Sequence, residues 1–290
     1  MILMSRFPTG AAGHDRLREL HTQLETAFAD LVSGDDWVCM LAVAARFHHY
    51  SPANVMLILC QRPDATRVAG YRTWQSLGRQ VRRGEHGLAI LAPCSYKVRR
   101  DDGPEADDEP RRVLRGFKVA HVFDVSQTEG EPIPDVRPAV LDGEAPAGLW
   151  DGLAAQVAAA GFTLQRDDCR PANGRTDYTA RTVTVRPDVS DAQAAKTLAH
   201  ELAHVALHDG TEYALGCRGL TEVEAESVAY VVATAAGLAT DTYSLPYVAQ
   251  WAGGNVNAIK ATAERVVTTA HAILSALDDS PADAAGLIVF

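Results

Sequence analysis

Apolar side chains recur at helical spacing in the first part of the chain. A helix over residues 14–32 would bury one face, formed by Leu17, Leu20, Leu24, Phe28 and Leu31. A second apolar segment runs from Trp37 to Phe47. Ser51 and Pro52 then supply an N-cap residue and a first-turn proline for a helix that extends to Gln61. The chain is therefore predicted to open with helices.

The pattern changes after Arg67, where short apolar runs alternate with glycines. The runs LAIL, SYKV and FKVAHVFDV are typical of β-strands. The segment RRDDGPEADDEPRR between the last two runs is acidic and contains proline, which favours an exposed loop. Residues 131–148 carry four prolines and no periodicity, so we expect a boundary between domains there.

The second half of the chain has a mainly helical pattern. Helices are predicted over 149–160, about 222–238 and about 256–277, and short strands over 162–165 and 182–186. Ser190 and Gln193 match a capping box that begins a further helix. These elements predict an α+β fold of two domains. We expect a helix-plus-antiparallel-sheet domain over 1–130, a linker over 131–146, and a mainly helical domain with a small sheet over 147–290.

Composition and charge exclude several classes of protein. No apolar run reaches the roughly 18 residues of a membrane span and the start lacks a secretory core, so we expect a cytoplasmic protein without a membrane partner. The five cysteines are scattered without a C-x-x-C pair, and we expect them to be small buried residues rather than disulfides or zinc ligands. A net charge of −10 argues against a protein that coats nucleic acid with its whole surface, although it can conceal a basic patch.

The segment KTLAHELAHVALH, residues 196–208, contains the motif His-Glu-x-x-His. On a helix, His200 and His204 stack on one face and can direct ring nitrogens at one ion, while Glu201 lies about 100° around the helix. Zinc with three protein ligands keeps its fourth position for water and lowers the pKa of that water towards roughly 7, and Glu201 would be the general base. His208, one turn further along, is expected to support a ligand or to lie on the surface, and a role as a direct ligand is the weaker alternative. The alternative is an alanine-rich helix without a metal.

A third ligand is expected from the segment TEVEAESVAY, residues 221–230. Glu222 and Glu226 fall on one helical face, whereas Glu224 points away and fits the last position of a capping box begun by Thr221. We predict Glu222 as the metal ligand and Glu226 as the carboxylate that orients a ligand histidine. The reverse assignment of Glu222 and Glu226 stays open. The alternative is that all three glutamates lie on a solvated first turn.

A local excess of positive charge lies between Arg62 and Arg100, where nine Lys or Arg accompany two acidic residues. Tyr71, Trp74 and Tyr96 are interleaved with these cations. Such a mixture suits single-stranded nucleic acid, because cations follow the phosphates while aromatic faces stack on bases. The predicted contact residues are Arg67, Arg72, Trp74, Arg79, Arg82, Arg83 and Lys97. The alternative is an ordinary basic surface with Trp74 in the core.

The second half of the chain resembles a known group of metalloenzymes. HELAHVALH followed by E-x-E-A is similar to the zincins with a glutamate ligand, in particular the ImmA/IrrE-like and ArdC-like metallopeptidase domains. This resemblance implies zinc, with manganese or another divalent ion as the alternative. It also implies a strand that aligns a peptide beside the site, for which residues 181–185 are the candidate. Tyr178 and Tyr230 are candidate transition-state donors, with core packing as the alternative for each.

The first half resembles a second, related group. YSPANVMLILCQRPDATRVAGYRTWQSLGRQVRRGEHGLAIL, with FKVAHVFDVSQTEG after it, is similar to the N-terminal single-stranded-DNA-binding domain of ArdC-type antirestriction proteins. Those proteins carry the two domains in this order. The resemblance implies an antirestriction-type protein that binds single-stranded DNA and carries a zinc-dependent metallopeptidase domain for an unidentified protein or peptide. Two alternatives stay open: a non-catalytic DNA-binding protein with a structural metal, and an ImmA-like protease that cleaves a repressor.

Overall fold

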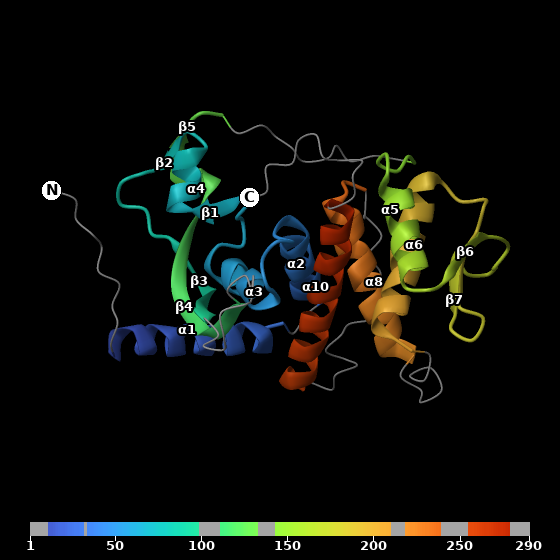
Figure 1. Ribbon diagram of the computed structural model, residues 1–290, viewed down its shortest axis with the longest axis horizontal. Helices are drawn as coiled ribbons and strands as arrows, with labels where there is room; N and C mark the ends of the chain where they lie inside the picture. The colour runs from blue at the N-terminus through green and yellow to red at the C-terminus, as the bar shows by residue number, and fades with distance from the viewer. Residues whose placement is uncertain are drawn as a thin grey trace, which may run out of the picture.

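The computed structural model describes residues 11–31, 34–98, 111–132, 143–209, 218–238 and 255–278. The expected acidic loop and most of the expected linker lie outside these residues. A larger sheet occupies one end of the molecule and a small sheet the other, with helices between them (Figure 1). The predicted α+β fold with two parts is therefore confirmed.

The N-terminal half combines helices with an antiparallel sheet. Its helices are α1 (Ala11–Ala29), α2 (Gly34–Arg46), α3 (Pro52–Gln61) and the short α4 (Tyr71–Ser76). Strand β4 (Arg111–Asp124) pairs on its two edges with β1 (Val68–Gly70) and β3 (Leu88–Val98). A separate ribbon pairs β2 (Arg79–Val81) with β5 (Thr128–Gly130). The runs LAIL and SYKV belong to one strand, β3, because only a register shift between Pro93 and Ser95 separates them.

Helix α3 covers the outer edge of this sheet with two side-chain amides. Its start is as predicted, since the Ser51 hydroxyl accepts a hydrogen bond from the Asn54 N–H. The Asn54 amide accepts from the Leu91 N–H and donates to the Leu91 carbonyl oxygen, at 2.8 and 3.0 Å. Gln61 does the same for Ala89, at 2.8 and 2.9 Å. The two amides satisfy backbone groups that would otherwise be open to another strand.

The C-terminal half is built around two long helices. They are α6 (Asp191–Leu207) and α8 (Arg218–Ala235), with α5 (Leu149–Ala159) beside α6. In the small sheet, β8 (Thr182–Val185) lies between β6 (Thr163–Arg166), which is parallel to it, and β7 (Gly174–Asp177), which is antiparallel. The Ser190 hydroxyl caps α6 by accepting from the Gln193 N–H. Among the described contacts only this half of the predicted capping box is present, and the Gln193 side chain donates to the Thr197 hydroxyl at 3.1 Å.

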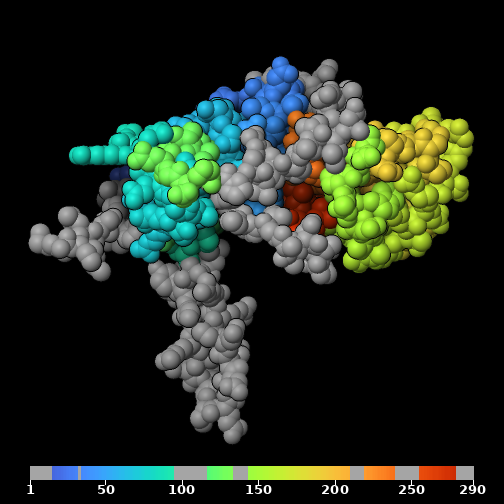
Figure 2. Space-filling view, turned by 90° about the horizontal axis from the view of Figure 1, so that it is seen from above, coloured from blue at the N-terminus to red at the C-terminus, as the bar shows by residue number. Residues whose placement is uncertain are grey.

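The two halves share one hydrophobic core. The last described helix, α10 (Val256–Asp278), packs against α5, α6 and α8 and also against α1 and α3, and Figure 2 shows it between the halves. Helix α2 packs on α8, where the Trp37 indole N–H donates to the buried Ser227 hydroxyl at 3.1 Å. The ring nitrogens of His271 on α10 each lie 3.0 Å from a backbone carbonyl oxygen near the end of α2, those of Tyr50 and Ala44. The N-terminal helices therefore bury their apolar faces on the C-terminal half.

The cysteines are not buried as the sequence predicted. Cys39 and Cys60 are exposed, and Cys94 and Cys169 are partly exposed. Cys217 lies outside the described residues. Apolar character favours burial only on average, whereas the position of a residue on a helix or strand decides it in each case.

The structure also bears on the expectation about membranes. Among the helices that the structure describes, no helix combines the length and the apolar character of a bilayer span.

Candidate functional site

Helices α6 and α8 bring four of the predicted side chains together. His200 and His204 lie one turn apart on α6, and Glu222 and Glu226 lie one turn apart on α8. The Nε2 atoms of His200 and His204 are 3.0 Å apart. The Glu222 carboxylate reaches both Nε2 atoms, at 3.5 and 3.7 Å. The three groups thus face one common point.

The spacing of His200, His204 and Glu222 fits a single ion. Ligand atoms about 2.0–2.1 Å from a tetrahedral zinc ion lie about 3.3 Å from one another. The observed separations of 3.0, 3.5 and 3.7 Å bracket that value. Two imidazole nitrogens and one carboxylate oxygen also form a donor set that zinc and related divalent ions accept. The group can therefore hold a divalent metal ion.

The surrounding charges favour a cation at this point. Burial opposes a charge on His200, but the Glu222 and Glu226 carboxylates outweigh burial and raise the pKa of His200 to about 9. Hydrogen bonds from His200 and His204 hold the pKa of Glu222 well below its usual range. The field that stabilises an imidazolium here would also stabilise a divalent ion, because both carry positive charge.

The Glu226 carboxylate lies on the Nδ1 side of the His200 ring, whereas Glu222 lies on the Nε2 side. Its carboxylate is 3.2 Å from His200 Nδ1 and 2.8 Å from Lys196 Nζ. Burial alone would raise the pKa of Glu226, but the contacts with His200 and Lys196 lower it. A carboxylate on Nδ1 fixes the orientation of the ring and leaves Nε2 for an ion. Glu222 and Glu226 therefore lie where a ligand and an orienting carboxylate would lie.

A buried chain of polar groups extends from His204 away from this point. His204 Nδ1 lies 3.1 Å from His208 Nδ1, and His208 Nε2 lies 3.0 Å from Glu224 Oε2. Arg265 on α10 approaches the same carboxylate oxygen at 3.4 Å. An ion bound to His204 Nε2 would leave the ring proton of His204 on Nδ1, which would donate to Nδ1 of His208. The ring proton of His208 would then lie on Nε2 and be donated to Glu224. The chain thereby fixes the tautomers of both histidines.

The predicted capping role of Glu224 is wrong. Helix α8 begins at Arg218, so Thr221 lies inside the helix and Glu224 points into the interior with 1% of its surface exposed. His208 is also buried and supports His204 instead of lying on the surface. The signal for His208 was present in the sequence, since it follows His204 by four residues and so falls on the ligand face of α6.

Glu224→Ala is expected to lower the free energy of unfolding by about 3 kcal/mol, because it leaves the buried His208 without its acceptor and removes the carboxylate that Arg265 approaches. Glu224→Gln keeps an acceptor oxygen for His208 and should cost less than half as much. Urea unfolding of the metal-free proteins, followed by circular dichroism, measures both values. Equal losses for the two variants, or a loss below about 1 kcal/mol for Glu224→Ala as for surface pairs, would contradict the role of this carboxylate.

Glu201 lies between α6 and the small sheet. It is 5% exposed, and the Thr176 hydroxyl on β7 donates to its carboxylate at 2.7 Å. Burial raises the pKa of Glu201, which makes it a stronger base than a carboxylate in water. Gly174 on β7 makes this close approach possible, since a Cβ there would lie 2.6 Å from Glu201 Oε1. Thr176 and Gly174 could not be identified from the sequence, because the polar run GRTD has no strand pattern.

Both β7 and β8 contact α6. Residues 181–185 contain the whole of β8, which is central in the sheet and already pairs on both edges, so the prediction that they align a peptide is wrong. Strand β7 contacts α6 and is an outer strand. Within the described ranges, no strand pairs with its second edge. A peptide can add only to an unpaired edge, so β7 is the strand able to align one.

The two tyrosines that were candidate transition-state donors are engaged by other parts of the protein. The Tyr178 hydroxyl donates to the His204 carbonyl oxygen at 3.1 Å and so braces the end of α6. Tyr230 is 9% exposed and packs in the core. Both placements correspond to the packing alternative.

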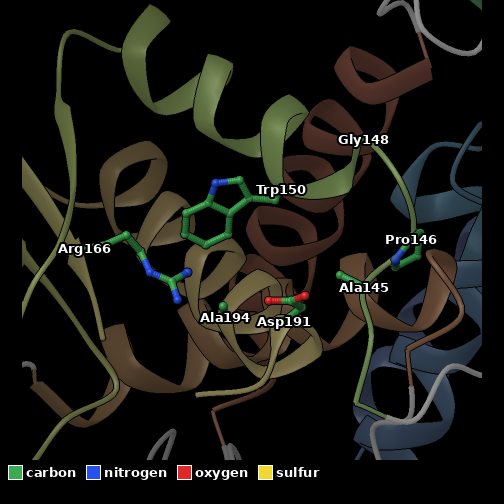
Figure 3. A pocket seen from close by; sticks show the side chains of 7 residues that line it. All are labelled: Ala145, Pro146, Gly148, Trp150, Arg166, Asp191 and Ala194. Atoms are coloured by element: carbon green, nitrogen blue, oxygen red, sulfur yellow. The ribbon is translucent and has the colours of Figure 1, made fainter. Parts of the chain in front are cut away.

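The cavity in Figure 3 lies beside the start of α6 and not at the histidines. Its volume is about 330 Å³, and its lining includes Trp150, Arg166 and Asp191. The Arg166 guanidinium lies 4.8 Å from the centroid of the Trp150 ring. Asp191 precedes His200 by nine residues, which is roughly 13 Å along a helix axis. The cavity is therefore separate from the candidate metal ligands His200, His204 and Glu222.

The predicted nucleic-acid contacts are corrected at Trp74. This side chain is fully buried, and its indole N–H donates to the Phe123 carbonyl oxygen at 2.9 Å, so it cannot stack on a base. The reason is that residues 71–76 form α4, which turns Trp74 inward. Arg79 is also engaged, since its guanidinium donates to Thr128 and Gly130 and ties β2 to β5.

Other predicted cations remain on the surface. Arg72 and Arg83 are exposed, Arg67 is partly exposed, and the exposed Arg82 pairs with Glu85 at 2.7 Å. Lys97 is part of β3, but its side chain lies outside the description.

Two aromatic side chains of this half are also exposed. Tyr71 is 48% exposed and Phe117, which the sequence analysis did not name, is 52% exposed. Phe117 and Phe123 share one face of β4 because they are six residues apart, and Tyr71 makes an edge contact with Phe123 at 6.5 Å between ring centroids. The alternation of the run FKVAHVFDV carried this signal.

Two family models match the chain. The N-terminal domain of the anti-restriction factor ArdC matches residues 18–125. The IrrE N-terminal-like domain matches residues 158–236. The first match contains the larger sheet with α2 and α3, and the second contains α6 and the metal group on α6 and α8.

Individual proteins show the same similarity at low identity. The uncharacterized protein pXO2-81 of Bacillus anthracis is 23% identical in an alignment 284 positions long, which covers 85% of this chain and 48% of that protein. The chain thus spans about half the length of this curated relative. Two crystal structures of the antirestriction protein ArdC from plasmid R388 are 22% identical. The metal-free structure has a TM-score of 0.48 over 79% of this chain and 84% of that one, and the Mn(II)-bound structure has 0.45 over 83% and 96%.

Proposed function

Because the chain is an ArdC-like protein, in which an ArdC N-terminal domain precedes an IrrE-like domain, we propose that it is an antirestriction-type protein with two activities. The N-terminal half binds single-stranded DNA, and the C-terminal half is a metal-dependent peptidase. The observation that carries the second activity is the convergence of His200, His204 and Glu222 on one point, with the buried carboxylate of Glu201 beside them.

The proposed ion is zinc, because two imidazoles and one carboxylate suit zinc, while manganese is the alternative. A divalent ion bound there would supply a Lewis acid that lowers the pKa of a water molecule and polarises a carbonyl group. Glu201 would accept the proton of the attacking water and pass it to the leaving amine. Thr176 holds the Glu201 carboxylate in position by donating to it at 2.7 Å.

The proposed substrate of this site is an extended peptide segment. Strand β7 runs beside α6 and offers the edge to which a peptide backbone can add. Adding a strand there would place the peptide backbone next to Glu201, since Thr176 of the same strand touches that side chain.

The DNA-binding proposal rests on exposed cations and aromatic rings in the N-terminal half. Arg72, Arg83, Tyr71 and Phe117 are all exposed, whereas the chain as a whole carries a net charge of −10. Cations neutralise phosphates, and exposed rings stack on unpaired bases. Duplex DNA offers few unpaired bases for stacking, so the surface favours single strands.

Replacing Arg72 and Arg83 together by alanine is expected to weaken binding of a labelled single-stranded oligonucleotide. For single strands, each lost phosphate contact lowers the slope of log K against log salt by about 0.7, so the double variant should lose about 1.4. Fluorescence anisotropy over a salt series measures this slope. Arg170→Ala is the matched control, because Arg170 is an arginine of the C-terminal half that pairs with Asp168 at 2.8 Å. Binding that ignores salt, or equal slopes for all three proteins, would overturn the proposal.

One observation favours a second candidate, in which the metal is structural and the protein is a non-catalytic DNA-binding protein. Helix α8 carries Glu222 and also receives α2 through the Trp37–Ser227 hydrogen bond. An ion that ties α6 to α8 would therefore stabilise the surface on which the N-terminal half packs.

A further inference from the structure

A second group of metal-binding side chains lies where α2 and α10 end. His48 and His49 follow the last turn of α2, and Asp278 is the last residue of α10. One possible ligand atom from each of the three residues lies within 4.8 Å of those of the other two. The group shares no residue with the site on α6 and α8.

Both ring nitrogens of His48 are buried. Nδ1 and Nε2 are both closed to solvent, and neither has a hydrogen-bond partner among the residues that the structure describes. His48 Nε2 lies 3.4 Å from Asp278 Oδ2, which exceeds the usual N–H···O distance of about 2.7–3.2 Å. It matches the spacing of about 3.3 Å between two ligands of one tetrahedral ion. Buried polar atoms without a partner are rare and point to a bound ion or water.

His49 supplies the third donor of this group. The centroids of the His48 and His49 rings are 4.0 Å apart with an angle of 48° between the rings, although the two residues are adjacent in the chain. The turn that carries them is fixed by α10, because the His271 ring lies 3.0 Å from the carbonyl oxygens of Ala44 and Tyr50 on either side of it. Two imidazoles held this close can place one nitrogen each on a shared ion.

The electrostatic setting also favours a cation. Helices α2 and α10 both end at this group, and the last turn of a helix carries a partial negative charge of about half an electron. Asp278 adds a full negative charge beside them. The guanidinium of Arg46, the last residue of α2, donates to the Ala65 carbonyl oxygen at 3.2 Å.

We propose that His48, His49 and Asp278 form a second metal site, which binds zinc or a related first-row divalent ion. Magnesium and calcium prefer oxygen donors, whereas two imidazoles and one carboxylate suit a transition metal. Two ligands come from the N-terminal half and the third from the last described helix of the C-terminal half. The bound ion therefore fastens the two halves together.

The test is the zinc content of the full-length protein after removal of metal and equilibrium dialysis against zinc. Wild type should bind about two ions per chain. Glu222→Ala and His48→Ala should each bind about one, and the double variant about none. Asp278→Asn, a change at the end of α10 that keeps the shape of the side chain, should also bind about one. A wild type that binds one ion, or His48→Ala and Asp278→Asn proteins that both bind two, would overturn the proposal.

A control and a second readout separate this site from unspecific binding and from misfolding. His21 is an exposed histidine on α1, and His21→Ala should still bind about two ions. A lower zinc content in His21→Ala would show that the count includes surface histidines and would overturn the proposal. In the Glu222→Ala background, zinc should raise the melting temperature, and this rise should vanish when Asp278→Asn is added. An equal rise in melting temperature in Glu222→Ala and in the double variant with Asp278→Asn would also overturn the proposal.

Discussion

Glu201→Gln is expected to slow peptide hydrolysis by about 10²–10⁴-fold, the usual contribution of a general base, while the metal content stays unchanged. Glutamine has the same shape and can still accept the hydrogen bond from Thr176, which the carboxylate accepts at 2.7 Å. It cannot take a proton from water, so only the chemical step is removed. Hydrolysis of casein, an unstructured protein, measured by the release of new amines, gives the ratio of rates for the two proteins.

Thr176→Val is the matched control for this prediction. It removes the hydroxyl that positions Glu201 but keeps the carboxylate, so its loss of activity should be smaller than that of Glu201→Gln. Full activity in Glu201→Gln would exclude the general-base role. If the wild type showed no casein hydrolysis and Glu201→Gln kept DNA binding and antirestriction in cells, the candidate with a structural metal would be favoured.

Glu222→Ala is expected to weaken metal binding by more than about 100-fold, because a ligand is lost, whereas the loss of an orienting carboxylate in Glu226→Ala should weaken it by about 10–100-fold. The difference follows from geometry, since Glu222 reaches the Nε2 atoms of both histidines, whereas Glu226 contacts His200 at Nδ1, away from the point where an ion would bind. Competition with a chromophoric chelator at constant pH measures the metal affinity of both variants. Both carry His48→Ala as well, so that only the site on α6 and α8 contributes. A larger loss for Glu226→Ala would reverse the two roles.

The helical part of the site could be predicted from the sequence because it depends on local spacing. His200 and His204 are four residues apart, and Glu222 and Glu226 are as well, so each pair shares a helix face whatever the rest of the fold does. Glu224 was misassigned because the start of α8 falls four residues before Glu222, which moves Thr221 from the cap into the helix. Helix boundaries are set by weak local preferences, and tertiary packing easily shifts them.

The contributions of the small sheet and of α4 could not be predicted in the same way. Strand β7 is polar, and it is a strand only because it pairs with β8, which lies further along the chain. Trp74 was placed among the DNA contacts because composition does not tell which side of a six-residue helix faces the core. The packing of α2 on α8 joins segments about 190 residues apart, as the Trp37–Ser227 hydrogen bond shows, and no local pattern encodes such a contact.

Through that hydrogen bond we expect the two proposed binding events to depend on each other thermodynamically. Ser227 is the neighbour of Glu226 on α8, so a displacement of α2 against α8 reaches the carboxylate that orients His200. Any ligand of the N-terminal half that favours one position of α2 must then alter the affinity for the ion, and the ion must alter the affinity for that ligand by the same factor. The protein would in that case sense the occupancy of one half through the other, without a moving hinge between separate domains.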